Sequence, residues 1–242
     1  MSTANQTIAV IIARAGSKGL PNKAMQPLAG RPLIEYTLEH ALGSRLVDHV
    51  VLTSDSPEIL AVGERFSVPS YMRPSALASD TATIDSAVRF GVETFENQHG
   101  KPCDQCAILY GNVPLRPTDL TDRALAKLNQ TQADSVQSVS PVEKMHPYWM
   151  KKVGGATGDV LEMYEDNRVY RRQDLPPVFM LDAGVLAVTR ESLFNVNPAE
   201  PHAFLGTDRR AVISPVGAVV DVDDPMDLAL AEVLIGRRRM SA

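Results

Sequence analysis

Residues 8–25 read IAVIIARAGSKGLPNKAM and decide the fold. The apolar run from Ile8 to Ala13 predicts a buried parallel strand. A short loop rich in small and cationic residues follows it. Glycine lets a backbone approach a phosphate group and direct its N–H groups at the oxygens, while arginine and lysine neutralise the charge. The segment therefore predicts a strand that ends at a triphosphate site, whose loop contains Arg14, Gly16, Ser17, Lys18, Gly19 and Lys23.

The loop matches neither of two common phosphate-binding motifs. The spacing G-x-x-x-x-G-K-[ST] of a Walker A loop does not occur, and the dinucleotide fingerprint G-x-G-x-x-G is absent. A Gly/Ser turn with solvated lysines is the alternative interpretation. The density of cations beside a buried strand end exceeds the usual surface pattern and argues against it.

The loop resembles the signature of the acylneuraminate cytidylyltransferases, which comprise CMP-sialic acid synthetases and their relatives for other nonulosonic acids and Kdo. ARAGSKGLPNK is close to the family form A-R-x-x-S-K-G-[IL]-P-x-K-N, with Ala24 where the family usually has Asn. Four further blocks follow at family-like spacing, so the resemblance covers nearly the whole chain. They are MRPSALASDTAT (72–83), PLR (114–116), RRQDLPPVF (171–179) and VVDVDDPMDLALAE (219–232).

Length and composition fit a globular protein of one large or two small domains. The chain has 242 residues, of which 44% are hydrophobic, and we interpret residues 1–242 as a single nucleotidyltransferase domain with one insertion. A net charge of −5 argues against a nucleic-acid-binding protein. No apolar run reaches the ~18 residues of a membrane span, and the start, MSTANQT, does not resemble a signal peptide. We expect a cytoplasmic protein without nucleic-acid or membrane partners.

Two cysteines, Cys103 and Cys106, form a lone C-x-x-C. A zinc site would need two further ligands, and no second pair follows. We expect ordinary reduced thiols.

Strand-like and helix-like segments alternate in the first half of the chain. Repeated β-α units indicate an α/β fold in three layers, doubly wound around a mainly parallel sheet. The resemblance implies the nucleotide-diphospho-sugar transferase type of this fold. Ligands in such sheets bind beyond the carboxyl ends of the strands, where the cationic loop lies. Strands are predicted at 8–13, 49–53, 106–110 and from 135, and helices at 33–42, 57–66, 83–96 and 120–129.

Residues 143–177 interrupt the alternation with the sequence HPYW, three glycines and a Pro-Pro pair. We interpret them as an inserted hairpin or arm. The resemblance implies that the arm forms a homodimer, or a tetramer, and reaches into the partner's active site. Trp149, the only tryptophan, suits an interface, and core packing is an equal alternative.

The resemblance implies that CTP is one substrate. Arg14 and Lys23 would lie on the triphosphate, and Ser17 would supply a hydroxyl or backbone contact. Arg73 would contact the nucleotide, with a surface arginine in a turn as the alternative. A cap or loop anchor is the preferred role for Asp80. The predicted nucleotide-binding set is Ala13, Arg14, Gly16, Ser17, Lys18, Lys23, Arg73 and Asp80.

A late acidic block predicts the metal site. Asp221 and Asp223 alternate with valines, so on a strand both carboxylates would point to one face, about 6–7 Å apart. Mg²⁺ prefers a few carboxylates together with phosphate oxygens and water. We therefore expect Asp221 and Asp223 to hold Mg²⁺, and Arg14, Lys23 and Asp223 to be catalytic. Caps and turns are the alternative role for these acidic residues.

The chain departs from the family pattern in the expected sugar pocket. Tyr110 stands where the family usually has Gln, residues 111–113 replace Pro-Thr-Ser, and residues 180–184 replace Arg-Pro-Asn-Gly-Ala. Asp182 would repel an anionic sugar unless it is protonated or paired. We therefore predict an acceptor other than ordinary sialic acid. The predicted substrate-binding residues are Tyr110, Asn112, Arg116, Arg172, Gln173 and Asp182, with Arg172 acting across the dimer.

Two other functions are compatible with the sequence. One is a nucleotidyltransferase for another sugar or nucleotide, and the other is a non-catalytic protein that binds a nucleotide. The intact cationic loop and acidic pair argue against the second. No histidine stands out as a general base, and His146 is the one to test.

Overall fold

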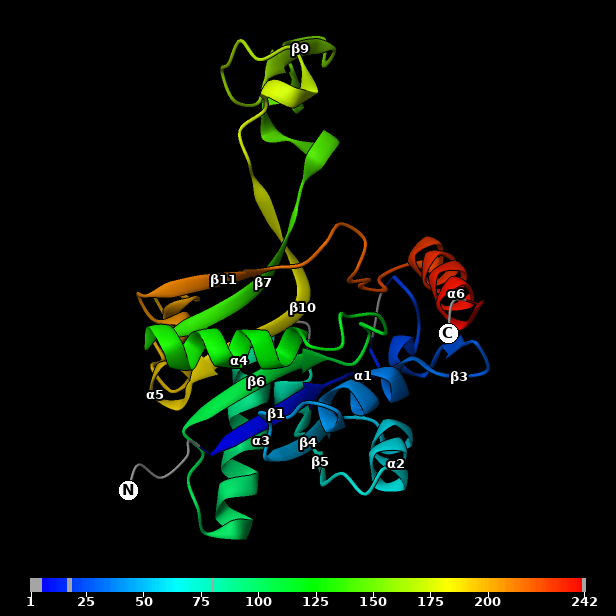
Figure 1. The fold of residues 1–242 in the computed structure, drawn as a ribbon, viewed down its shortest axis with the longest axis vertical. Helices are drawn as coiled ribbons and strands as arrows, with labels where there is room; N and C mark the ends of the chain where they lie inside the picture. The colour runs from blue at the N-terminus through cyan, green and yellow to red at the C-terminus, as the bar shows by residue number, and fades with distance from the viewer. Residues whose placement is uncertain (1–5, 17–18, 80, 241–242) are drawn as a thin grey trace.

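A seven-stranded sheet runs through the middle of the molecule in the order β11-β7-β10-β6-β1-β4-β5 (Figure 1). The computed structural model describes residues 6–16, 19–79 and 81–240. Within them, β10 is antiparallel to β6 and β7, and the other neighbouring strands are parallel. The predicted mainly parallel sheet is confirmed. Its strands are β1 (Thr7–Ile12), β4 (His49–Ser54), β5 (Ser70–Met72), β6 (Gln105–Tyr110), β7 (Ser135–Pro141), β10 (Phe179–Thr189) and β11 (Arg209–Ile213).

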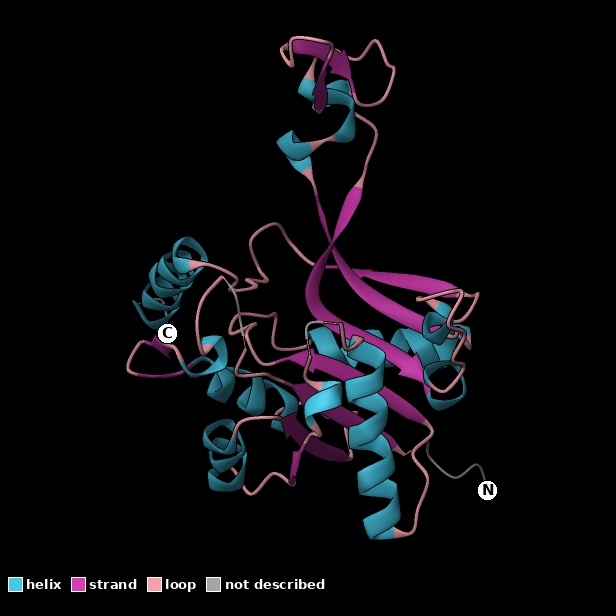
Figure 2. Cartoon of the chain, turned by 180° about the vertical axis from the view of Figure 1, so that it is seen from behind, coloured by secondary structure: helices cyan, strands magenta, loops and turns pink. Residues whose placement is uncertain are grey.

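Helices cover both faces of this sheet (Figure 2). Alternation along β1 explains the two covered faces, because successive side chains of a strand point to opposite sides. Ala9 and Ile11 belong to one buried cluster with residues of α1, α2 and α4, whereas Ile8 and Val10 belong to another with residues of α3. The predicted three-layer architecture is confirmed. The helices are α1 (Leu33–Leu42), α2 (Pro57–Arg65), α3 (Ile84–His99), α4 (Leu120–Thr131), α5 (Arg190–Leu193) and α6 (Pro225–Met240).

The end of the chain returns to its beginning. In α6, Ala231 and Ile235 pack with Leu28 of the small hairpin made by β2 (Pro27–Leu28) and β3 (Arg31–Pro32). Just before α6, Val220 forms an isolated bridge with Leu115. This return places the acidic block beside the cationic loop.

The segment 143–177 stands away from the sheet on a stalk (Figure 1). β7 and β10 form the stalk, where Phe179 pairs with Pro141. An exposed hairpin lies in the arm, made by β8 (Lys151–Gly154) and β9 (Val160–Met163). Trp149 is half-buried inside the arm and is outside the buried clusters that pack on the sheet. Three short 3-10 helices complete the arm: η3 (Glu143–Met145), η4 (Pro147–Trp149) and η5 (Arg172–Asp174).

No described helix is both long enough and apolar enough to cross a membrane. Cys103 and Cys106 are both buried and free, and burial raises the pKa of each thiol. A thiol with a raised pKa is a poor nucleophile and metal ligand at neutral pH.

Candidate active site

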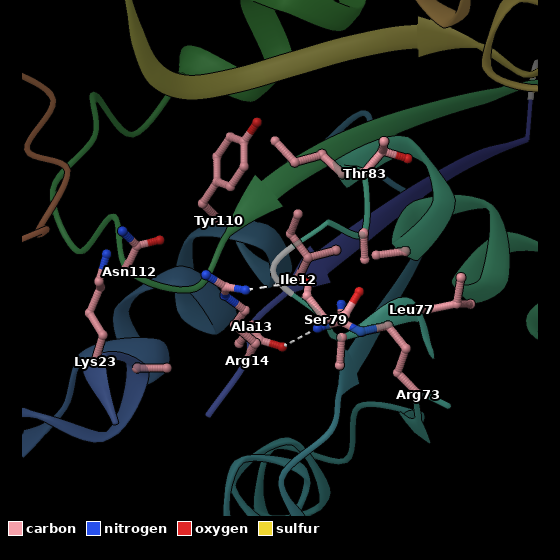
Figure 3. Close-up of a pocket in the computed structure, with 15 residues that line it drawn as sticks. Ile12, Ala13, Arg14, Lys23, Arg73, Leu77, Ser79, Thr83, Tyr110 and Asn112 are labelled. Carbon is pink, nitrogen blue, oxygen red and sulfur yellow. Dashed lines mark hydrogen bonds between the residues drawn. The ribbon is translucent and has the colours of Figure 1, made fainter. Parts of the chain in front are cut away.

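A pocket of about 310 Å³ opens at the carboxyl ends of the central strands (Figure 3). Ile12, Ala13 and Arg14 reach it from the end of β1, and Tyr110 and Asn112 from the end of β6. Ligands of doubly wound sheets bind at this edge. The remaining lining residues are Lys23, Ala24, Arg73, Leu77, Ala78, Ser79, Ala82, Thr83, Ile84 and Ala87.

Two arginines contribute positive charge to the pocket. Arg73 is only 5% exposed and donates a hydrogen bond from Nη2 to the carbonyl oxygen of Ala13, at 3.0 Å. Its Nε is buried without a partner among the described residues. The Arg14 guanidinium lies 3.5 Å from the carbonyl oxygen of Ser79. The surface position considered for Arg73 is therefore wrong, because its guanidinium is buried against the carbonyl oxygen of Ala13.

Burial lowers the pKa of Arg73, and neighbouring Arg14 adds to this shift while Asp55 opposes it. The two arginine cations repel each other and Asp55 compensates them only in part, so the pocket favours an anionic ligand.

Asp55 also contributes to the structure and charge of this pocket, although the sequence motifs did not point to it. One of its oxygens accepts a hydrogen bond from the backbone N–H of Ala15, at 3.0 Å. This contact holds the start of the cationic loop against the end of β4. The available signal was its place directly after a buried strand, at the same edge of the sheet as Arg14.

The acidic block does not form a strand, which was the condition for placing both carboxylates on one face. Outside the isolated bridge at Val220, residues 221–223 have no regular secondary structure. Their backbone is hydrogen-bonded to the loop that follows β6 and not to a strand, since Val222 N–H donates to the carbonyl oxygen of Asn112 at 3.0 Å. The condition on which the predicted carboxylate spacing depended is therefore not met, because a loop and not a strand lies beside these residues.

The two carboxylates nevertheless meet on one group, the side-chain amide of Asn112. Nδ2 of Asn112 lies 2.5 Å from Asp221 Oδ1 and 3.5 Å from Asp223 Oδ1. It also lies 3.1 Å from the carbonyl oxygen of Val222. An amide nitrogen has two hydrogens, and here it lies among three acceptors. The position favours a positively charged group.

Lys23 joins the cationic loop to this acidic pair. Its ammonium forms an ion pair with Asp223, 200 positions away in the chain. Figure 3 shows Lys23 and Asn112 together at one end of the pocket. Gly19 makes the approach possible, because a Cβ there would stand 2.6 Å from the carbonyl oxygen of Asp223. The pocket and the acidic pair therefore form one site.

The electrostatic balance of this end is negative. Burial, followed by the charge of Asp223, raises the pKa of Asp221 to about 6, against the opposing effects of Lys23 and Arg116. Burial and the charge of Asp221 also raise the pKa of Tyr110. Burial is the larger cause of both shifts and the neighbouring carboxylate the smaller one, so a cation bound beside Asp221 would lower both pKa values.

The donor set at this end fits Mg²⁺. Two carboxylates and a carbonyl oxygen are hard ligands of the kind that this ion takes, and it usually keeps phosphate oxygens and water as the rest. Among the described residues, no group of three or more His, Cys, Asp and Glu side chains forms a complete metal site. A divalent ion here would therefore depend on the triphosphate for further ligands.

Other predicted residues lie apart from the pocket. Arg116 is buried beneath it, and Asp182 accepts hydrogen bonds from Ser138 Oγ at 2.5 Å and Gly184 N–H at 3.0 Å. Arg172 and Gln173 are exposed on the arm, where Arg172 pairs with Glu143 at 2.8 Å. The structure thus separates the predicted substrate residues into three groups: Tyr110 and Asn112 in the pocket, Arg116 and Asp182 behind it, and Arg172 and Gln173 on the arm.

Several predictions do not reach the pocket or cannot be placed. His146 is buried in the arm, where its Nε2 lies 3.0 Å from the carbonyl oxygen of Pro176. Gly16 is exposed in the loop. Ser17, Lys18 and Asp80 lie outside the described residues.

Comparison with known proteins identifies the family. A family model described as "Cytidylyltransferase" matches residues 8–177. The chain belongs to the cytidylyltransferase family. The resemblance and the nucleotidyltransferase class inferred from the sequence are confirmed.

Two relatives of this cytidylyltransferase are similar over nearly their whole length. This chain is 30% identical over 237 residues to the CMP-N,N'-diacetyllegionaminic acid synthase of Legionella pneumophila, and the match covers 94% of this chain and 95% of the relative. This chain is also 28% identical over 232 residues to a pseudaminic acid cytidylyltransferase of Campylobacter jejuni, and the match covers 95% of this chain and 96% of the relative.

A solved structure confirms the fold. It is that of a CMP:2-keto-3-deoxy-manno-octonic acid synthetase complexed with CTP. Its TM-score is 0.71 at 20% identity, over 96% of this chain and 99% of that chain.

Proposed function

We propose that this cytidylyltransferase transfers CMP from CTP to a 2-keto sugar acid and releases pyrophosphate. The ion pair between Lys23 and Asp223 supports the proposal most directly, because it brings the cationic loop and the acidic pair to one site. Nucleotide transfer needs both, since a triphosphate must be held by cations and neutralised at its reacting phosphate.

The residues of the site would have different roles in this reaction. Arg14 and Lys23 would bind the triphosphate and favour the charge that develops as the α-phosphate is attacked. Asp221 and Asp223 would hold Mg²⁺, which when bound neutralises phosphate oxygens and orients the leaving group. Asn112 would keep the two carboxylates on one side, as it does here. Arg73 would complete the positive wall of the nucleotide pocket.

The proposed acceptor is a nonulosonic or Kdo-like acid other than ordinary sialic acid. Tyr110 lies in the pocket where the sialic acid pattern has Gln, and Asp182 lies in an irregular part of β10 close to Arg116. The carboxylate of Asp182, where the family usually has Asn, changes which sugar substituents the expected sugar pocket accepts. The names of the two relatives, for legionaminic and pseudaminic acid, agree with this proposal.

The proposed assembly is a homodimer built by the arm. Large apolar side chains are exposed there, with Leu161 at 69% and Tyr170 at 92%. Several large exposed apolar side chains within one short segment favour an interaction site there. Arg172 and Gln173 on the arm would then reach the sugar acid in the partner's pocket. The exposed set also includes Met145, Met150, Val153, Val160, Met163 and Tyr164.

A pyrophosphate-release screen tests the function. The purified chain is incubated with Mg²⁺, one of the four ribonucleoside triphosphates and one 2-keto sugar acid. We expect release with CTP and a nonulosonic or Kdo-like acid, and none from the Asp223→Asn variant. CTP binding without release for any acid would indicate a non-catalytic protein, and steady turnover of N-acetylneuraminate at a low-micromolar KM would refute the proposed acceptor. A cytoplasmic location remains a prediction of the sequence.

A further inference from the structure

Arg116 is the most deeply enclosed cation near the site, and it does not line the pocket. Only 4% of it is exposed, and it makes hydrogen bonds to three separate parts of the fold. Nε donates to the carbonyl oxygen of Gly184 at 2.6 Å, and Nη2 to that of Tyr110 at 3.0 Å. Nη1 donates to Thr37 Oγ1 at 3.0 Å and to the carbonyl oxygen of Val113. No carboxylate of the described residues forms an ion pair with it.

These contacts turn the carbonyl groups of the 110–113 loop inward. Thr37 reinforces them, because its hydroxyl lies 3.1 Å from the carbonyl oxygens of both Tyr110 and Val113. With both ends of the loop held, Asn112 between them faces the acidic pair. Its side chain contacts Asp221 and Asp223, and its carbonyl oxygen accepts from Val222 N–H.

The remaining contact leads to the base of the arm. Gly184 lies in β10 between Leu181 and Leu186, where the pairing with β7 changes register. Asp182 and Ala183 form an irregularity of the strand there, with Ala183 at φ 59° and Asp182 accepting a hydrogen bond from Gly184 N–H. The Arg116 guanidinium therefore connects the loop that carries Asn112 to the irregular part of β10 at the base of the stalk.

We propose that Arg116 is a positioning residue, which fixes the Asn112 loop and through it the two carboxylates that would hold the metal. This inference rests on the proposed function. Its basis is geometric: a planar guanidinium donates in several fixed directions, whereas a lysine ammonium on a flexible stem is a point charge. Residues that orient metal ligands typically change metal affinity by about 10–100-fold when they are replaced.

The variant Arg116→Lys separates geometry from charge, because it keeps the positive charge and removes the planar guanidinium with its fixed donor directions. CTP binding is measured by calorimetry with EDTA and again with Mg²⁺, alongside the Mg²⁺ concentration for half-maximal pyrophosphate release. We expect this half-saturation to rise about 10-fold or more, and the gain in CTP affinity that Mg²⁺ produces to fall. CTP affinity in EDTA should stay at the wild-type value.

The matched control is Arg89→Lys on α3, where a mostly buried arginine donates to Asp85 at 2.6 Å and to the carbonyl oxygen of Leu193 at 3.1 Å. It should lower the melting temperature and leave both Mg²⁺ measurements unchanged. Thr37→Val removes one hydrogen-bond partner of Arg116. It should change both Mg²⁺ measurements in the same direction as Arg116→Lys, by a smaller amount. If Arg116→Lys fails to fold, the result for Thr37→Val tests the inference.

Two outcomes would overturn the inference. One is a folded Arg116→Lys protein with wild-type Mg²⁺ dependence, and the other is an equal loss of CTP affinity with and without Mg²⁺. A wild-type chain that neither binds CTP nor releases pyrophosphate would instead contradict the proposed function.

Discussion

The pocket edge of the sheet and the arm differ in how their side chains are supported. At the sheet edge, Arg73, Asn112 and Arg116 have partners from distant parts of the same chain, and their positions are determined within one copy. In the arm, the side chains of β8 and β9 are mostly exposed, and Leu161 has no covering layer in the described chain. The described side chains at the pocket edge are thus held in place within one chain, whereas the arm presents exposed apolar side chains that the proposed second copy would cover.

The largest expected effect comes from breaking the ion pair that joins the two halves of the pocket. Lys23→Met removes the ammonium that contacts Asp223 and would contact the triphosphate. We expect kcat/KM for CTP to fall about 100–1,000-fold, the usual cost of one charge-assisted donor at a reacting phosphate or carbonyl. Steady-state pyrophosphate release measures it. Lys101→Met, at an exposed position before β6, should leave the rate unchanged.

The arm is tested by placing a charge on its apolar surface. Leu161→Asp should convert the proposed dimer to a monomer, since an unpaired carboxylate is costly to bury. Light scattering after gel filtration measures the mass. Turnover should fall about 10–100-fold because the arm no longer reaches the partner's pocket, while CTP binding is retained.

Glu162→Ala on the same strand is the control for the arm, because its side chain points to the opposite face of β9. A wild-type mass for Leu161→Asp would contradict the proposed role of the arm, and loss of CTP binding would contradict the division between the two regions.

A smaller effect is expected where the cationic loop passes the acidic block. Gly19→Ala places a Cβ 2.6 Å from the carbonyl oxygen of Asp223, so one backbone must move. We expect the KM for CTP with Mg²⁺ to rise about 10-fold through the misplaced ligands, with little change in melting temperature. Gly236→Ala, where a Cβ meets nothing within 4 Å, is the matched control. An unchanged KM for Gly19→Ala would show that the close approach is dispensable.

The smallest effect concerns the stability of the sheet's helical layer. His40 on α1 lies with Nε2 2.8 Å from Thr121 Oγ1 of α4. Burial lowers the pKa of His40 to about 4, and Arg116 adds to the shift while Asp122 and Asp119 oppose it. The unfolded chain therefore binds the proton first, and this part of the stability, present above about pH 6.5, is lost as the pH falls towards about 4.

For the wild type we expect His40 to account for a loss of up to about 3 kcal/mol between pH 7 and pH 4. Urea unfolding at several pH values measures the loss, and His40→Gln should show a shallower dependence. His49→Gln, on β4, is the comparison variant. Equal pH dependence in the wild type and His40→Gln would contradict this assignment.

Much of the fold could be predicted because the local pattern and the tertiary structure agree. Ile8 to Ile11 are apolar without interruption, as a strand covered on both faces must be, and the structure buries them in two opposite layers. The helix at residues 33–42 has the predicted ends. These elements depend on burial patterns that repeat every few residues and can be recognised without knowing their partners.

The candidate site was predictable only in part. Lys23, Asp221 and Asp223 were named from their chemistry, and they do come together. The spacing argument for the acidic pair does not apply, because it holds only for a strand and the residues follow a loop. Arg116 was expected to face the substrate and is buried under the loop, since residue spacing does not say toward which side a side chain turns.

The sequence alone determined the α/β class, the cationic loop at the end of the first strand and the family, since each depends on residues close together in the chain. The tertiary structure decided which distant groups touch: Lys23 with Asp223, Asn112 with both carboxylates, and Arg116 with three carbonyl groups from β6, its loop and β10. The physical reason is that such contacts depend on the path of the backbone between them, and that path is set by packing of the whole chain.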